Sequence, residues 1–141
     1  MGSSFNVVNQ QECLAEANRV LTKNGWFVCM WNHRDLNDDL QRHCEVIINK
    51  HIPDYHYGSR REDQTQVIRD SGLFRDPVQI TGKVVQKMSH ADFVTAWKSH
   101  ATLQRQSGTD FQKIIHEIER SLPGGDSLRV AYTTRVWCAQ L

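Results

Sequence analysis

The feature that most constrains this chain is the apolar run Trp26–Trp31, which follows a helical pattern and the turn residues Asn24-Gly25. A continuous apolar run of this length suits a β-strand that is covered on both faces, as in a parallel sheet packed between helices. Nothing before it in the chain can pair with its outer edge, and an open apolar edge invites pairing with another strand. The run therefore predicts a neighbouring strand that is missing here or supplied by a second chain.

Helical and extended patterns alternate along the rest of the sequence and predict an α/β fold with three strands and about five helices. The later strands are expected at about 78–87 and 128–140. Helices are expected at about 10–23, from residue 37 or 38 to just before Pro53, from Ser59 to Gly72, from Ser89 through Leu103, and around Phe111 to Leu122. We expect residues 1–4 to be a leftover from cloning and residues 5–141 to form a single domain.

Composition narrows the class of protein. The chain has 141 residues and a formal net charge of +1, so no charge excess points to nucleic acid or an anionic membrane surface. No apolar run approaches the roughly 20 residues that span a bilayer. The cysteines Cys13, Cys29, Cys44 and Cys138 include no close pair and mostly fall at apolar positions. Buried free thiols in a reducing, cytoplasmic protein are the expected interpretation.

Five segments, in order, resemble one family. Phe5 resembles the end of a His-Trp-Phe segment that follows the fourth strand of that family. Glu16–Trp26 resembles its "E…RVLKPGG" helix and turn, and Trp31–Asp35 resembles its "WN.RD" strand end. Residues 71–84 and 122–134 resemble the runs into its sixth and seventh strands. On these residues the chain resembles the C-terminal half of a class I S-adenosylmethionine-dependent methyltransferase of the small-molecule, type 11-like group.

This resemblance implies a part of a Rossmann-like sheet in which the three strands are numbers five, six and seven. Their expected order is five-seven-six, with the last strand antiparallel between the other two. The open edge of Trp26–Trp31 would then face the fourth strand. The implied partners are a small-molecule methyl acceptor and either the missing N-terminal half or a second copy across the open edge.

The cofactor half of such an enzyme carries a glycine-rich turn that this chain lacks. There is no G-x-G, and Gly124-Gly125 precedes a strand rather than a helix. We therefore expect this truncated chain alone to bind S-adenosylmethionine weakly or not at all and to be inactive. Phe5 is the one residue that the resemblance places on the cofactor side.

Candidate acceptor-pocket residues lie just past the first strand. Trp31, Asn32, His33 and Arg34 come where open α/β sheets build their pockets. His33 is a candidate base or orienting group near the acceptor, although a plain polar turn explains the same residues. Tyr55 and Tyr57, with His56 between them, suit an acceptor lid or simple packing of a long loop.

Two other groups of residues have competing interpretations. His43, Cys44, His51 and His56 lack the close ligand pair of a metal site, so no metal is predicted. Arg129 and Arg135 in the last strand could meet an acidic acceptor, but a solvated or helix-packed strand face explains them as well.

Two further hypotheses stay open. The chain could be a non-catalytic half-domain used for binding or homo-oligomer assembly, with a dimer joined through Trp26–Trp31. Alternatively, it could be an unrelated α+β ligand-binding domain whose pocket is lined by its tryptophans.

Overall fold

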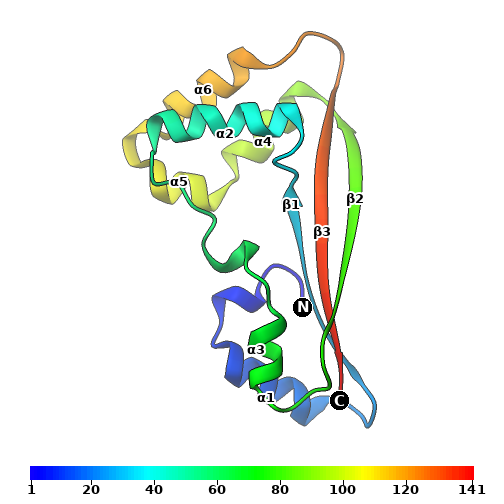
Figure 1. The fold of residues 1–141 in the computed structure, drawn as a ribbon. Helices are drawn as coiled ribbons and strands as arrows, with labels where there is room; N and C mark the ends of the chain where they lie inside the picture. Colours follow the sequence, from blue (N-terminus) through cyan, green and yellow to red (C-terminus); the bar gives the residue numbers. More distant parts are fainter. The chain divides into compact units, whose positions relative to one another are not determined.

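The fold is an α/β arrangement built on one three-stranded sheet. In the computed structural model, which describes residues 1–141, the strands are β1 (Trp26–Arg34), β2 (Val78–Met88) and β3 (Leu128–Gln140). Their order is β1-β3-β2, so the last strand of the chain lies in the middle (Figure 1). The strand order expected from the resemblance is therefore confirmed.

The central strand runs antiparallel to its neighbours. The Leu141 N–H donates to the Gly25 carbonyl at 2.9 Å, and the Asp35 N–H donates to the Ala131 carbonyl at 3.1 Å. Residue numbers thus rise along β1 as they fall along β3. The arrows of β2 and β3 also point in opposite directions (Figure 1). This pairing confirms the predicted antiparallel last strand.

β1 differs from the strand that its sequence suggested. Every second side chain from Phe27 to His33 is buried, whereas Trp26 is 54% exposed and Met30 is 43% exposed. The expectation of a strand covered on both faces is wrong, because the other face carries no helix from this chain. An uninterrupted apolar run shows that burial is favourable on both faces but not that both faces are buried.

Six α-helices accompany the sheet, and the third helix departs from its predicted bounds. The helices are α1 (Gln10–Val20), α2 (Asp39–His51), α3 (Thr65–Asp70), α4 (His90–Lys98), α5 (Ala101–Ser107) and α6 (Phe111–Ser121), and the short 3-10 turns are η1 (Phe5–Val7), η2 (Gly58–Arg61) and η3 (Gly108–Asp110). The expected helix from Ser89 through Leu103 is divided into α4 and α5.

Side-chain caps fix where the longer helices begin. Asn9 Oδ1 accepts hydrogen bonds from the N–H groups of Gln11 and Glu12 at the start of α1. Asp38 caps α2, and Ser89 caps α4. Each cap satisfies backbone donors that the first helical turn leaves without partners. These three starts were predicted from the sequence and are confirmed.

The segment after Ser59 is a correction. The sequence predicted one helix from Ser59 to Gly72, but η2 ends at Arg61 and α3 begins only at Thr65. The side-chain amide of Gln64, which is buried, donates to the carbonyls of Ser59 and Glu62. These bonds hold the chain in a turn where a continuous helix would need those carbonyls. The predicted stop at Gly72 is confirmed by its positive φ of 64°.

The chain divides into two compact units, each with its own core. Unit 1 comprises residues 1–33, 58–83 and 133–141, and unit 2 comprises residues 34–57 and 84–132. All three strands contribute residues to both units. The prediction of a single domain stays a prediction, because the units share these strands.

The two cores use different kinds of residue. Unit 1 buries aromatic rings from Phe5, Phe27, Trp31 and Trp137. Unit 2 buries mainly aliphatic side chains of α2 and α6 around Trp97, including Ile48, Ile114 and Ile118. In β3 the buried residues are Leu128 and Val130 in unit 2 but Trp137 and Ala139 in unit 1. The buried positions thus change from even-numbered to odd-numbered residues along one strand.

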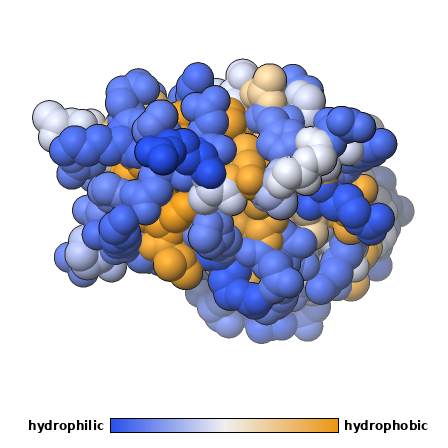
Figure 2. All heavy atoms as spheres, turned by 90° about the horizontal axis from the view of Figure 1, so that it is seen from above, coloured by the Kyte–Doolittle hydropathy of each residue, from blue (hydrophilic) through white to orange (hydrophobic).

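The surface and the thiols complete the description. No helix has the length and apolar composition needed to cross a membrane. Seen from above, apolar atoms reach the surface between hydrophilic side chains (Figure 2). All four cysteines are free; Cys29 and Cys44 are buried, and Cys13 and Cys138 are partly exposed. Burial raises the pKa of both Cys29 and Cys44 to about 12, so these thiols stay protonated at neutral pH.

Candidate functional site

An arginine surrounded by aromatic rings stands out in unit 2. The guanidinium carbon of Arg34, at the end of β1, lies 3.7 Å from the centroid of the Trp97 ring. Trp97 packs beside His100, with centroids 5.5 Å apart, and His100 beside Tyr57 at 6.2 Å. Tyr57 meets Tyr55 edge-on at 5.2 Å. Arg34, Tyr55, Tyr57, Trp97 and His100 are called the arginine–aromatic cluster below.

Polar partners hold this cluster in place. The Tyr57 hydroxyl donates to Glu45 Oε2 at 2.6 Å, which ties the loop before η2 to α2. Burial lowers the pKa of Arg34, while Tyr57, Tyr132 and Tyr55 oppose that effect. A guanidinium stays charged in any protein environment at neutral pH. The cluster therefore holds a fixed positive charge against aromatic rings inside unit 2.

The sequence predicted part of this cluster. It named Arg34, Tyr55 and Tyr57 as pocket residues, and the structure brings these three together in unit 2. The sequence did not identify Trp97 and His100 as site residues, because the helix expected to contain them was interpreted as one that covers the hydrophobic core. The available signal was the histidine His100 three residues after Trp97.

The other predicted pocket residues belong to unit 1. Trp31 is 1% exposed, and its indole N–H donates to Asn6 Oδ1 at 3.0 Å. Its ring meets the Trp137 ring edge-on at a centroid distance of 5.6 Å. Asn32 is exposed and accepts a hydrogen bond from the Thr134 hydroxyl at 3.1 Å. Trp31 thus serves the core, while Asn32 lies on the surface beside β3.

Phe5, which the resemblance placed on the cofactor side, is fully buried. Its ring lies 5.3 Å from the Phe27 ring and 6.4 Å from the Trp31 ring, between centroids. In this structure its contacts are those of a core aromatic residue.

His33 is the unusual polar residue of unit 1. It is 8% exposed, and its Nε2 atom is buried without a hydrogen-bond partner. Burial lowers the pKa of His33 to about 4, and the positive charges of Arg61, Arg135 and Arg60 act in the same direction. The imidazole is therefore neutral at physiological pH, as a general base or a hydrogen-bonding group requires.

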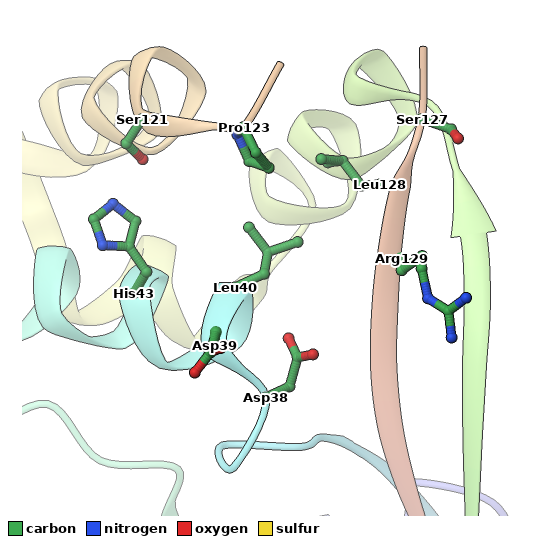
Figure 3. Close-up of a pocket in the computed structure, with 9 residues that line it drawn as sticks. All are labelled: Asp38, Asp39, Leu40, His43, Ser121, Pro123, Ser127, Leu128 and Arg129. Atoms are coloured by element: carbon green, nitrogen blue, oxygen red, sulfur yellow. The ribbon is translucent and has the colours of Figure 1, made fainter. Parts of the chain in front are cut away.

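A separate hollow of about 600 Å³ lies in unit 2 (Figure 3). The N-terminal part of α2 and its cap line one side, with Asp38, Asp39, Leu40 and His43. The end of α6, the turn after it and the start of β3 line the other. Asp38 already caps α2, and Asp39 already pairs with Arg42. Its acidic groups thus have structural roles. Arg129, considered from the sequence as a partner of an acidic acceptor, lines this hollow, but none of the pocket residues predicted at 31–34, 55 and 57 does.

Comparisons with known proteins give a limited result. No protein-family profile matches the chain, and no curated protein matches it. Among solved structures, the chain is similar to a "putative methyltransferase" from Bacillus halodurans C-125, with 16% sequence identity and a TM-score of 0.43. The alignment covers 94% of this chain and 62% of that protein, so the chain spans less than two thirds of its length.

Proposed function

We propose that this chain is the acceptor-side part of an S-adenosylmethionine-dependent methyltransferase that acts on a small molecule. The observation that carries the proposal is the sheet: β3 lies antiparallel between β1 and β2, in the order that the family resemblance implies for strands five, seven and six. The residues Trp31–Asp35 that carry part of the resemblance fall at the end of β1, which supports the same assignment.

The acceptor would bind at the arginine–aromatic cluster. Methyl transfer is an in-line displacement, so holding the acceptor in the correct orientation contributes most to the rate. Aromatic faces would hold a planar acceptor, and Arg34 would fix a negatively polarised group. A base is needed only where the attacking atom carries a proton.

The glycine-rich cofactor turn has to come from outside these residues. The outer edge of β1 supports such a partner, because Met1 of this chain already pairs with the β1 backbone there. The expectation that nothing before Trp26 could pair with this edge is therefore wrong. The Met1 amino group donates to the Val28 carbonyl, and the Met30 N–H donates to the Met1 carbonyl at 3.0 Å. These bonds follow the pattern of parallel strands. A strand from an N-terminal half or from a second copy would extend this pairing.

Calorimetric titration with S-adenosylhomocysteine tests the proposal. We expect no micromolar binding by residues 1–141 alone, and micromolar binding by the complete translation product of the gene, whatever its length. Light scattering on both samples reports whether a dimer forms. Micromolar binding by a monomer of this chain would overturn the inference that the glycine-rich cofactor turn lies outside these residues. No binding by the complete product would overturn the methyltransferase assignment and favour a non-catalytic, self-assembling half-domain.

A further inference from the structure

A groove crosses unit 2 where strands end. The hollow of about 600 Å³ beside α2 shares Ser127 and Arg129 with a second hollow of about 400 Å³, which Val85 and Lys87 of β2 complete. The two hollows together are called the unit 2 groove below. Lys87 is next to the last residue of β2, and Asp38 caps the helix that follows β1. Open α/β sheets bind small molecules beyond the carboxyl ends of their strands, in pockets of this size.

The middle of the unit 2 groove is apolar and belongs to the edge of a packed core. Leu40, Pro123 and Leu128 line it. Leu128 is 2% exposed, and Leu40 packs against the same aliphatic core. Figure 3 shows the side chains of Leu40 and Leu128 directed into the hollow. An apolar surface that is already fixed by packing can contact the carbon skeleton of a ligand without first being ordered.

One carboxylate of the unit 2 groove keeps its charge available. Asp38 caps α2 through Oδ1, which accepts from the Gln41 N–H at 3.0 Å, and it takes part in no ion pair. Asp39 differs, because it pairs with Arg42. Figure 3 shows the Asp38 carboxylate on the side of α2 that faces β3. Asp38 can therefore receive a cationic group of a ligand while its other oxygen keeps the helix capped.

Positive charge lies at the β2 side of the same groove. Arg129 and Lys87 line the second hollow together with Ser127, and no carboxylate lines it. Both cationic side chains are exposed, and neither takes part in an ion pair. Figure 3 shows the Arg129 guanidinium and the Ser127 hydroxyl on the side of β3 that faces β2. A guanidinium, an ammonium group and a hydroxyl are donors that suit a carboxylate.

We propose that the unit 2 groove binds a small zwitterion whose ammonium and carboxylate groups are separated by an apolar body. Asp38 receives the ammonium group, and Arg129 with Lys87 binds the carboxylate. Leu40 and Leu128 contact the carbon skeleton between them. A ligand with only one of the two charges gains only one of the two polar contacts, so the arrangement selects for the zwitterion. The site depends neither on methyl transfer nor on the arginine–aromatic cluster.

NMR titration of the complete chain, with labelled backbone amides, tests the site. The probes are ω-amino acids of increasing chain length, from β-alanine to ω-aminocaprylate, each compared with the fatty acid and the alkyl amine of equal length at constant pH and ionic strength. We expect saturable shifts of the Leu40 and Leu128 amide signals. The best ω-amino acid should bind about 10-fold or more tightly than either matched probe, because each lacks one charge-assisted hydrogen bond. No saturable shift at any length, or equal binding of the fatty acid, would overturn the proposal.

Variants that preserve the fold assign the two ends of the groove. Asp38→Asn removes the charge but keeps a capping oxygen, since Asn caps helices about as well as Asp. It should weaken zwitterion binding about 10-fold or more and leave fatty-acid binding unimpaired. Arg129→Gln should weaken zwitterion binding as much and leave amine binding unimpaired. Asp54→Asn and Arg105→Gln are the controls, because both residues are exposed in unit 2 and line neither hollow. Equal weakening by the controls, or no weakening by the groove variants, would contradict the site.

Discussion

Charged side chains are arranged differently in unit 1 and unit 2. In unit 2, the Tyr57 hydroxyl bonds to Glu45, and Glu117 accepts from Lys50 at 2.7 Å and contacts His51 at 2.8 Å. Lys50 and His51 together lower the pKa of Glu117. In unit 1, His33 is buried without a partner for Nε2 and faces three arginines. Buried polar atoms without a hydrogen-bond partner occur in both units, since Gln41 Oε1 and Trp97 Nε1 of unit 2 also lack one. The contrast lies in the charges: unit 2 pairs Lys50 with Glu117, whereas like charges surround a neutral imidazole in unit 1.

The cores differ as well, and the largest expected effect tests that difference. Trp137→Ala should lower the free energy of unfolding by about 4 kcal/mol, because it removes a fully buried ring and its bond to Asp63. Ile118→Ala, at an equally buried site in unit 2, should cost about 3 kcal/mol. Urea denaturation followed by circular dichroism measures both. A smaller loss for Trp137→Ala than for Ile118→Ala would contradict the burial of the Trp137 ring in the core of unit 1.

The second prediction concerns pH and belongs to unit 1. The pKa of His33 lies near 4 in the folded chain, below the ordinary value of 6.5. Between these values the unfolded chain takes up a proton that the folded chain does not. The free energy of unfolding should therefore fall as pH drops from about 6.5 to about 4, by about 3 kcal/mol in total.

Denaturation at several pH values, in buffers without carboxylate or phosphate, measures this loss. His33→Gln should remove that part of the pH dependence, while His116→Gln, at an exposed position on α6, should keep it. An unchanged pH dependence in His33→Gln would mean that other groups cause the loss.

A third prediction tests the hydrogen bond between Tyr57 and Glu45 in unit 2. Tyr57→Phe keeps the ring and removes the hydroxyl that donates to Glu45 Oε2 at 2.6 Å. We expect a loss of about 1–2 kcal/mol in the free energy of unfolding, since a partly buried hydrogen bond to a charged group is lost. Glu45→Gln retains an acceptor and should lose less. A larger loss for Glu45→Gln would show that Glu45 has a more important partner than Tyr57.

The smallest expected loss of stability comes from removing a helix cap, and it should be of equal size in both units. Asn9→Ala removes the cap of α1 in unit 1, and Ser89→Ala removes the cap of α4 in unit 2. Each should lower the free energy of unfolding by about 1 kcal/mol, because one helix start loses its acceptor in each case. Thermal denaturation of both variants checks this. A difference of more than about twofold between them would mean that one cap also contributes to packing.

Local patterns in the sequence determined much of this protein. Asn9, Asp38 and Ser89 marked helix starts that depend only on neighbouring backbone groups, and the last strand at 128–140 was read from its own β-branched residues. The strand order followed from the family resemblance. Gln64 shows the limit, since its contacts with the preceding turn divide a helix that local preference alone would continue.

The burial of individual faces and the grouping around His33 were decided only by the tertiary structure. The continuous apolar run predicted that β1 has two apolar faces, but the helices of this chain cover just one of them. The sequence identified His33 and Arg135 separately, and Arg60 and Arg61 not at all. These residues are far apart along the chain, and only the pairing of β1 with β3 and the bond from Arg135 to η2 bring them together. Local sequence encodes local structure, whereas a group of charged side chains from three segments depends on long-range packing.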